Sequence, residues 1–335
     1  MVSPNNHGLV VTRVERASPE AIRAAAGILR QGGLVALPTE TVYGLGAHAE
    51  NPLAVRAMFA AKGRPADHPV IVHLPRAELL AQFAEPVSDA AWKLAEAFWP
   101  GPMTLVLRRT SRVSDLVTGG LQTVGIRVPG HPTALALLEE FGGPVAAPSA
   151  NRFGRVSATR AEHVAAELGG RVDLILDGGQ CPVGVESTIL DVSQGHVALL
   201  RPGAVTQEQV EAVLGMPLAK PTHAPKVSGS LPSHYAPQAI VEIVAREALA
   251  ARALQLAVSG KRTAILSSEA PAIEHPAIIA VPIPASSLAL AQSLYDLLRQ
   301  VDALGCEVAL ICLPAEEGIG VAIADRLRRA AGPRD

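Results

Sequence analysis

The chain has 335 residues, of which 49% are hydrophobic and 18% are charged. This length suits two domains, and the composition excludes a disordered chain. Lys and Arg number 29 against 31 for Asp and Glu, a formal net charge of -2, which argues against a large nucleic-acid footprint but leaves room for a local basic pocket.

The cysteines and the absence of targeting signals indicate a cellular compartment. Cys181, Cys306 and Cys312 are few, odd in number and outside any CxxC spacing, which indicates a reducing environment without a disulfide scaffold. His68 and His73 form no zinc motif, so no structural metal site is expected. No basic head precedes an apolar core at the N-terminus, and no apolar stretch reaches about 18 residues. We therefore expect a soluble, cytoplasmic protein without a membrane partner.

The first expected elements are a strand at residues 10–14 and a helix at residues 18–30, which Ser18 caps. An apolar run at residues 34–37 then predicts a buried strand that stops at Pro38. More polar side chains follow than a simple turn requires, namely Thr39, Glu40, Thr41 and Tyr43. We therefore expect this loop to face a ligand.

A helix at residues 52–61, with Asn51 as its N-cap, brings two cations to its end. These are Lys62 and Arg64, and a strand at residues 70–74 follows them. Two cations beside a polar loop form a pocket for an anion such as a triphosphate or a carboxylate. Alternatively, both side chains complement the helix dipole from the solvent side. These residues alone leave both interpretations open.

Further along, residues 75–83 and 88–98 favour helices, and residues 100–107 favour a turn that feeds a core strand. Residues 123–129 predict a short strand in which Arg127 points to the face opposite its apolar neighbours. If that face is buried, the arginine requires an anionic partner, and if it is exposed, the arginine requires none. The residues by themselves favour exposure.

Residues 145–151, V-A-A-P-S-A-N, form a second dense motif. A strand ends there, and Ser149 and Asn151 then present a hydroxyl and an amide. The small Ala147 allows a ligand to approach the backbone closely, and Ser157 lies in the polar loop that follows. Such groups satisfy turns in most proteins, so this motif is weak evidence when taken alone.

Two more polar residues accompany later strands. Ser187 lies at the start of a strand in G-V-E-S-T-I-L-D, and Arg201 ends another in L-L-R-P-G. Each has an ordinary alternative, a turn serine or a surface arginine. These residues occur in order with the other motifs, and that order favours a ligand-binding site over the ordinary alternatives.

The composition changes abruptly at residues 220–237, which are rich in Pro, Ser, Gly and His and have no period, so they predict a linker. An alternation of strands and helices then restarts. It predicts a small α/β unit with a parallel sheet, and its elements are expected at residues 240–244, 246–259, 263–266, 277–283, 286–304 and 308–313.

The motifs P-T-E-T-V-Y-G-L, K-G-R-P, V-A-A-P-S-A-N and H-Y-A-P resemble, in order, those of the YrdC-like threonylcarbamoyl-AMP synthases in their long form. The resemblance covers about residues 10–330. It implies an α/β fold: a YrdC-like twisted mixed sheet with helices and a concave basic cleft (residues 1–217), a linker that acts as an active-site lid (218–238), and a small Rossmann-like domain (239–335).

The resemblance also implies an activity. Such enzymes make threonylcarbamoyl-AMP and pyrophosphate from L-threonine, bicarbonate and ATP, with Mg²⁺ accompanying ATP. The product is used for threonylcarbamoyladenosine modification of tRNA, after a functional hand-off to the tRNA threonylcarbamoyl transferase. No nucleophilic triad is visible in the sequence, so catalysis by positioning and charge stabilisation is expected. No stable nucleic-acid binding is expected.

The resemblance assigns roles to residues that match the family motifs. Lys62 and Arg64 are the expected catalytic cations, and no residue is assigned to a metal. The expected threonine site comprises Thr39, Thr41, His73, Thr123, Arg127 and Ser187. The expected ATP site comprises Lys62, Arg64, His68, Ala147, Ser149, Asn151, Ser157, Arg201 and Tyr235.

The chain departs from the family motifs at two places, and two alternative functions remain. Phe153 and Gly154 stand where many relatives carry Ser-Gly, and Ser228 stands where many carry proline, which leaves the conformation of the lid open. One alternative function is a double-stranded RNA-binding YrdC-like module without adenylating activity. The other is a carbamoyl-transfer domain of the hydrogenase-maturation type, against which the absence of acylphosphatase and zinc-finger segments argues.

Overall fold

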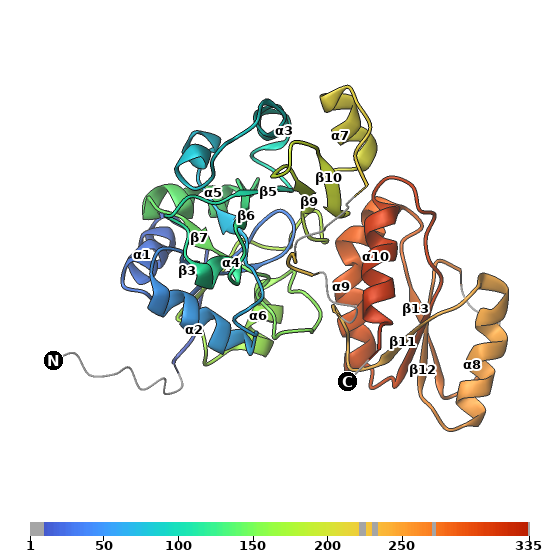
Figure 1. The fold of residues 1–335 in the computed structure, drawn as a ribbon. Coiled ribbons are helices and arrows are strands. Elements are labelled where there is room, and N and C mark those ends of the chain that lie inside the picture. Colours follow the sequence, from blue (N-terminus) through green and yellow to red (C-terminus); the bar gives the residue numbers. More distant parts are fainter. Residues whose placement is uncertain (1–9, 221–225, 230–233, 270–272, 334–335) are drawn as a thin grey trace.

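The computed structural model describes residues 10–220, 226–229, 234–269 and 273–333 (Figure 1). These residues form two separate sheets. A ten-stranded sheet has its strands within residues 13–201, and a four-stranded sheet has its strands within residues 240–311. The expected α/β fold is confirmed, whereas the domain limits placed at residues 217 and 238 stay predictions.

The first sheet is mixed, as expected. β5 pairs antiparallel with β6 but parallel with β9, and β2 pairs antiparallel with β3 but parallel with β8. The order across the sheet is β1-β8-β2-β3-β7-β4-β6-β5-β9-β10. The strands are β1 Arg13–Arg16, β2 Val35–Leu37, β3 Gly44–His48, β4 Val72–His73, β5 Met103–Arg108, β6 Thr123–Arg127, β7 Val145–Ala146, β8 Leu174–Asp177, β9 Thr188–Asp191 and β10 Ala198–Arg201.

Helices bury both faces of this sheet. Val35 packs with Leu29 and Leu138 in one hydrophobic cluster, whereas the next residue, Ala36, belongs to a second cluster that contains Met58. Successive strand residues point to opposite faces, so the two clusters are the two cores of the domain. The helices are α1 Pro19–Arg30, α2 Pro52–Lys62, the 3₁₀ helix η1 Ala77–Gln82, α3 Asp89–Phe98, α4 Asp115–Thr118, α5 Pro132–Phe141, α6 Ala161–Leu168 and α7 Gln207–Leu214.

Local capping fixes the helix that carries the two expected cations. The Asn51 side chain accepts hydrogen bonds from the backbone N–H groups of Leu53 and Ala54, so α2 begins where the sequence predicts. Gly63 ends the helix in the left-handed conformation, with φ at 63°, which glycine adopts without strain. The turn places Lys62 and Arg64 on either side of Gly63.

The second sheet is fully parallel, with the order β11-β14-β12-β13. Figure 1 shows α9 and α10 between this sheet and the first domain, with α8 on the far side. None of the helices in the described ranges combines the length and apolar character that crossing a membrane requires. The elements are β11 Ile240–Ile243, η2 Arg246–Ala248, α8 Leu249–Val258, β12 Thr263–Ser267, β13 Ile278–Pro282, α9 Ser287–Ala303, β14 Val308–Ile311 and α10 Gly320–Ala330.

Several elements differ from the sequence prediction, among them the unexpected short helix α4 and the division of the helix expected at residues 246–259 into η2 and α8. Residues 75–83 contain a short 3₁₀ helix, Ala77–Gln82, in place of the expected α-helix. β3 was not expected, because its sequence G-L-G-A-H contains two glycines, which weaken strand propensity. Pairing with β2 and β7 overrides that weakness, and Gly46 fits closely between Leu37 and Val145. Helix α5 was not expected either.

Candidate active site

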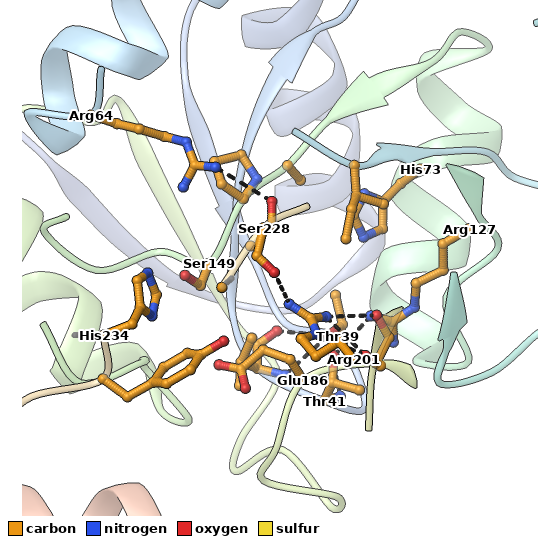
Figure 2. Close-up of a pocket in the computed structure, with 18 residues that line it drawn as sticks. Thr39, Thr41, Arg64, His73, Arg127, Ser149, Glu186, Arg201, Ser228 and His234 are labelled. Carbon is orange, nitrogen blue, oxygen red and sulfur yellow. Dashed lines mark hydrogen bonds between the residues drawn. The ribbon is translucent and has the colours of Figure 1, made fainter. Parts of the chain in front are cut away.

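Residues from separate strand ends line one cavity (Figure 2). They come from the loops after β2 and β7, from the last residues of β4, β6 and β10, and from the linker. Many of the residues that the sequence assigns to the site are among them, namely Thr39, Thr41, Arg64, His73, Arg127, Ala147, Ser149, Ser187, Arg201 and Tyr235. The expected convergence of cations and hydroxyl groups therefore occurs in the fold.

A chain of hydrogen bonds organises one corner of the cavity. Thr39 donates to the carbonyl of Val42 at 2.6 Å, so its hydroxyl accepts from Thr41 at 2.8 Å. Thr41 in turn accepts from Arg127 Nη1 at 2.9 Å. Arg127 is thus fixed by the loop that follows β2, and its own position at the end of β6 brings that loop and strand together.

Arg127 is buried, which corrects the exposure that the residues alone favoured. Its side chain is 4% exposed, and its Nη2 lies 2.6 Å from Glu40 Oε1. This contact lacks hydrogen-bond geometry, so Arg127 Nη2 and both Glu40 oxygens have no hydrogen-bond partner among the described residues. Arg127 Nη2 is therefore charge-paired with Glu40 but makes no hydrogen bond within the described residues.

Other polar atoms at the cavity share this property. Arg64 Nε, His73 Nδ1, His234 Nδ1 and the Tyr235 hydroxyl are buried and lack hydrogen-bond partners in the part of the chain that the structure describes. Burying polar groups without partners is costly, and native proteins rarely leave several such groups together. This cluster of unpartnered groups indicates a binding site for a polar or anionic ligand.

The two histidines at the cavity are neutral at physiological pH. Burial, aided by the charge of Arg127, lowers the pKa of His73 to about 3. Burial likewise lowers the pKa of His234 to about 3. Arg64, by contrast, stays charged at pH 7, because burial lowers its pKa only to about 10. The positive charge of the cavity therefore comes from guanidinium groups.

The linker lies between two of these guanidinium groups. Arg201 Nη1 donates to the backbone carbonyl of Ser228 at 2.7 Å, and Arg64 Nη2 lies 3.4 Å from the Ser228 hydroxyl (Figure 2). Arg201 also donates to the carbonyl of Ser187 at 2.8 Å and to its hydroxyl at 3.1 Å. Ser228 of the linker thus contacts two cations that a substrate would need.

Lys62 does not line the cavity. Its ammonium group is buried and donates to the backbone carbonyls of Ser149 and Asn151. Burial and the nearby charge of Arg64 hold the pKa of Lys62 well below its usual range. The structure thus places Lys62 behind the turn that presents Ser149, where it fixes the backbone of that turn.

The remaining expected residues also lie outside the cavity lining. His68 contacts the Phe153 ring edge-on, and Thr123 lines a separate small pocket under the linker. The Asn151 amide donates to two backbone carbonyls of its own loop. Ser157 donates to Glu186 Oε1 at 2.6 Å. Their assignments to threonine or ATP stay predictions.

Several cavity residues were not assigned from the sequence. Glu186, Ser228 and His234 line the cavity, and Glu40 pairs with Arg127 beside it. All four lie within motifs or segments that the sequence analysis singled out, so proximity to those motifs was the available signal. Their side-chain directions depend on tertiary packing and were not readable.

The described side chains that line the cavity do not form a metal-binding site by themselves. In the described ranges, no group of three or more His, Cys, Asp or Glu residues is placed to hold a metal ion. Glu186, the carboxylate that lines the cavity, already accepts hydrogen bonds from Ser157, Tyr295 and Arg326. A divalent cation would therefore have to rely on ligands that a substrate brings.

Two families match consecutive parts of the chain. The Sua5/YciO/YrdC family, described as telomere recombination, matches residues 27–203. The family described as threonylcarbamoyl-AMP synthase, C-terminal domain, matches residues 205–332. The two matches together include every strand of both sheets except β1.

Full-length relatives and solved structures agree with this. The chain is 39% identical to the threonylcarbamoyl-AMP synthase of Pyrococcus abyssi over 97% of this chain and 98% of that protein, and 42% identical to that of Bacillus subtilis over 93% of each. The structure of P. abyssi Sua5 complexed with L-threonine matches with a TM-score of 0.88 at 39% identity, over 96% of this chain and 97% of that one. A variant of P. abyssi Sua5 with a histidine and a tyrosine replaced by alanine matches with a TM-score of 0.89 at 37% identity, over 96% of each chain. The chain therefore belongs to the threonylcarbamoyl-AMP synthases of the Sua5/YrdC family, which are nucleotidyltransferases.

Proposed function

We propose that the protein makes L-threonylcarbamoyl-AMP and pyrophosphate from L-threonine, bicarbonate and ATP. The observation that carries this proposal is the cluster of buried groups without hydrogen-bond partners at one cavity, above all Arg64 Nε, His73 Nδ1 and the Tyr235 hydroxyl, beside the charged Arg127. They offer hydrogen bonds and positive charge to two kinds of anion, a carboxylate and a phosphate. The P. abyssi relative solved with L-threonine supports an amino-acid site in the same fold.

Threonine is proposed to bind at the corner formed by the loop after β2. Arg127 would meet its carboxylate through Nη2, which has no hydrogen-bond partner in the described residues. The side-chain hydroxyl of threonine would lie near Thr39 and Thr41, whose own hydroxyls already form an ordered chain. An ordered chain of donors costs little reorganisation when substrate arrives.

The proposed reaction then has two steps. The threonine amine attacks the carbon of bicarbonate, and loss of water leaves a carbamate. A carbamate oxygen attacks the α-phosphorus of ATP, and the bond from that phosphorus to the bridging oxygen breaks, so pyrophosphate leaves with the electron pair. Negative charge grows on the phosphates, and Arg64 and Arg201 are placed to stabilise it.

The carbamate intermediate and the threonylcarbamoyl-AMP product both decompose in water, so the cavity has to close around them. Ser228, His234 and Tyr235 of the linker line the cavity in this structure, which supports the expected role of the linker as a lid. Mg²⁺ is proposed as part of the MgATP substrate, where it neutralises phosphate charge. Because the cavity carboxylate Glu186 is already engaged, phosphate oxygens and water would supply its ligands.

The product is proposed to pass to the transferase that modifies tRNA, in the cytoplasm and without stable nucleic-acid binding by this chain. The direct experiment incubates the purified protein with ATP, L-threonine and labelled bicarbonate. Label is expected in an adenylate only when all three substrates are present. Salt-sensitive binding of double-stranded RNA without such a product would instead favour the RNA-binding alternative.

A further inference from the structure

A carboxylate at the catalytic cavity is held from the other domain. Glu186 lies next to Ser187 at the cavity. Its Oε2 accepts from Arg326 Nε on α10 at 2.8 Å and from the Tyr295 hydroxyl on α9 at 2.7 Å. Its Oε1 accepts from Ser157 at 2.6 Å. Two of the three donors therefore come from the C-terminal domain.

Arg326 does not itself line the cavity, and its side chain is fully buried behind Glu186. It also donates to the backbone carbonyl of Pro202 at 3.0 Å, directly after Arg201. A fully buried arginine is strongly unfavourable unless an anion and hydrogen-bond acceptors meet it. The pairing across the two domains is therefore a specific feature of the fold, and it requires the C-terminal domain to be docked.

The pair sets the charge of the cavity wall. Burial by itself raises the pKa of Glu186, but the charges of Arg326 and Arg201 outweigh it and bring the pKa to about 2. Glu186 is therefore anionic at pH 7, next to a site that has to accept phosphates. Arg326 balances this negative charge from behind, so Arg201 does not have to do so alone.

The same two residues of the C-terminal domain contact the linker. The Arg326 guanidinium carbon lies 5.3 Å from the centre of the Tyr235 ring, a cation–π distance. The Tyr295 ring stacks on Tyr235 with centroids 5.8 Å apart and an angle of 27° between the planes. Tyr235 has φ at 61°, a backbone conformation that non-glycine residues rarely adopt, so these ring contacts help to hold it.

We propose that Arg326 and Tyr295 are positioning residues of the ATP site, supplied by the C-terminal domain: they balance the charge of Glu186 and hold Tyr235, so that the positive charge of Arg201 is available to the triphosphate. This inference rests on the proposed function, because it takes ATP as the ligand. It assigns the C-terminal domain a direct part in assembling the catalytic cavity.

The test is equilibrium binding of ATP to the full chain, which needs no turnover. Arg326→Met leaves the charge of Glu186 unbalanced beside the phosphates, so ATP is expected to bind about 10-fold or more weakly. The KM for ATP should rise more than the KM for threonine. Arg328→Met is the matched control, because Arg328 is a half-exposed arginine on the same helix and pairs with Glu316 within its own domain. It should bind ATP as the wild type does.

The double variant separates charge from packing. Glu186→Gln combined with Arg326→Met removes both charges, and ATP binding is expected to return to within about 3-fold of wild type. Glu186→Gln alone should be less stable than wild type, because Arg326 then keeps only Asp325 as an anionic partner. If the double variant binds ATP as weakly as Arg326→Met, the charge-balance account is overturned.

Tyr295→Phe keeps the ring stack and removes only the hydroxyl, so it tests the proposal even if Arg326→Met does not fold. Weaker ATP binding by a few fold supports a positioning role for Tyr295, and unchanged binding overturns it. A wild-type protein that binds ATP but makes no adenylate from threonine and bicarbonate would overturn the proposed function alone. The two failures are therefore distinguishable.

Discussion

Arg127 Nη2 lies 2.6 Å from the carboxylate of Glu40, and this buried contact joins the end of β6 to the loop that follows β2. Its geometry is not that of a hydrogen bond, so the pair is mainly coulombic. A buried pair of this kind is poor for stability by itself, because the cost of removing two charges from water is incompletely recovered. It is well suited to receiving a charged substrate.

Arg127→Ala is expected to raise the KM for threonine by about 10- to 100-fold, because a hydrogen bond to a charged carboxylate contributes roughly 1.5–3 kcal/mol. The KM for ATP should change much less. Arg76→Ala serves as the control, since Arg76 is exposed and pairs with Glu139 on the surface. Steady-state kinetics with threonine as the varied substrate make the measurement, and an unchanged KM would remove Arg127 from the threonine site.

Gly229→Ala is expected to disrupt the contact between the linker and the cavity. A Cβ at Gly229 would lie 2.1 Å from the Tyr235 hydroxyl and 3.2 Å from Arg201 Nη1, at a φ of 81°. We expect kcat/KM for ATP to fall by at least about 10-fold, because Tyr235 or the linker has to move.

Gly195→Ala is the matched control for this substitution. Gly195 has a similar φ of 75°, but its Cβ would meet open space. It should lose about 1 kcal/mol of stability from the strained backbone while keeping its activity. Equal losses of activity in both variants would show that the Gly229 variant loses activity through backbone strain and not through displacement of Tyr235 or the linker.

The stability of the protein should depend on pH through His73. Its folded pKa of about 3 lies below the unfolded value of about 6.5. The contribution of neutral His73 to the free energy of unfolding is therefore complete above about pH 6.5. It is lost as the pH falls towards 3, since only the unfolded chain takes up the proton in that window. Between pH 6 and pH 5 the loss is about 1 kcal/mol.

His73→Gln removes this titration, so urea unfolding at pH 6 and pH 5 should show a smaller decrease in the free energy of unfolding for the variant. His234 is present in both proteins and contributes equally to both. Identical decreases in wild type and variant would mean that His73 is protonated in the folded state at these pH values.

Lys62→Met is expected to destabilise the protein by about 1–3 kcal/mol, because the backbone carbonyls of Ser149 and Asn151 lose their buried donor. ATP turnover should fall as well, since the turn that presents Ser149 is no longer fixed. Lys93→Met, at an exposed lysine of α3, is the control. Chemical denaturation compares the two variants. Equal stability of Lys62→Met and wild type would contradict the role of Lys62 in fixing the turn that presents Ser149.

The sequence predicted well what depends on the ends of strands. Thr39, Arg127 and Ser149 each end or follow an apolar run, and the sheet order brings β2, β6 and β7 close enough for these residues to share a cavity. The resemblance of the ordered motifs to the family supplied these assignments, and strand ends with the loops that follow them are where α/β folds place ligands.

What the sequence could not predict depends on packing between distant segments. The Glu186–Arg326 pair joins residues that are 140 positions apart, and no periodicity or spacing relates them. Lys62 looked like a substrate-facing cation, yet the fold directs its ammonium group to two backbone carbonyls. Both outcomes depend on side-chain direction, which a strand or helix pattern leaves undetermined beyond the face of the element.

The most direct test of the central claim is the initial rate of pyrophosphate release, measured with ATP, L-threonine and bicarbonate together and with each omitted in turn. If the cavity joins an amino-acid carbamate to the α-phosphate of ATP, release requires all three substrates and is suppressed by omitting any one. Release at the same rate without threonine or without bicarbonate would contradict the account.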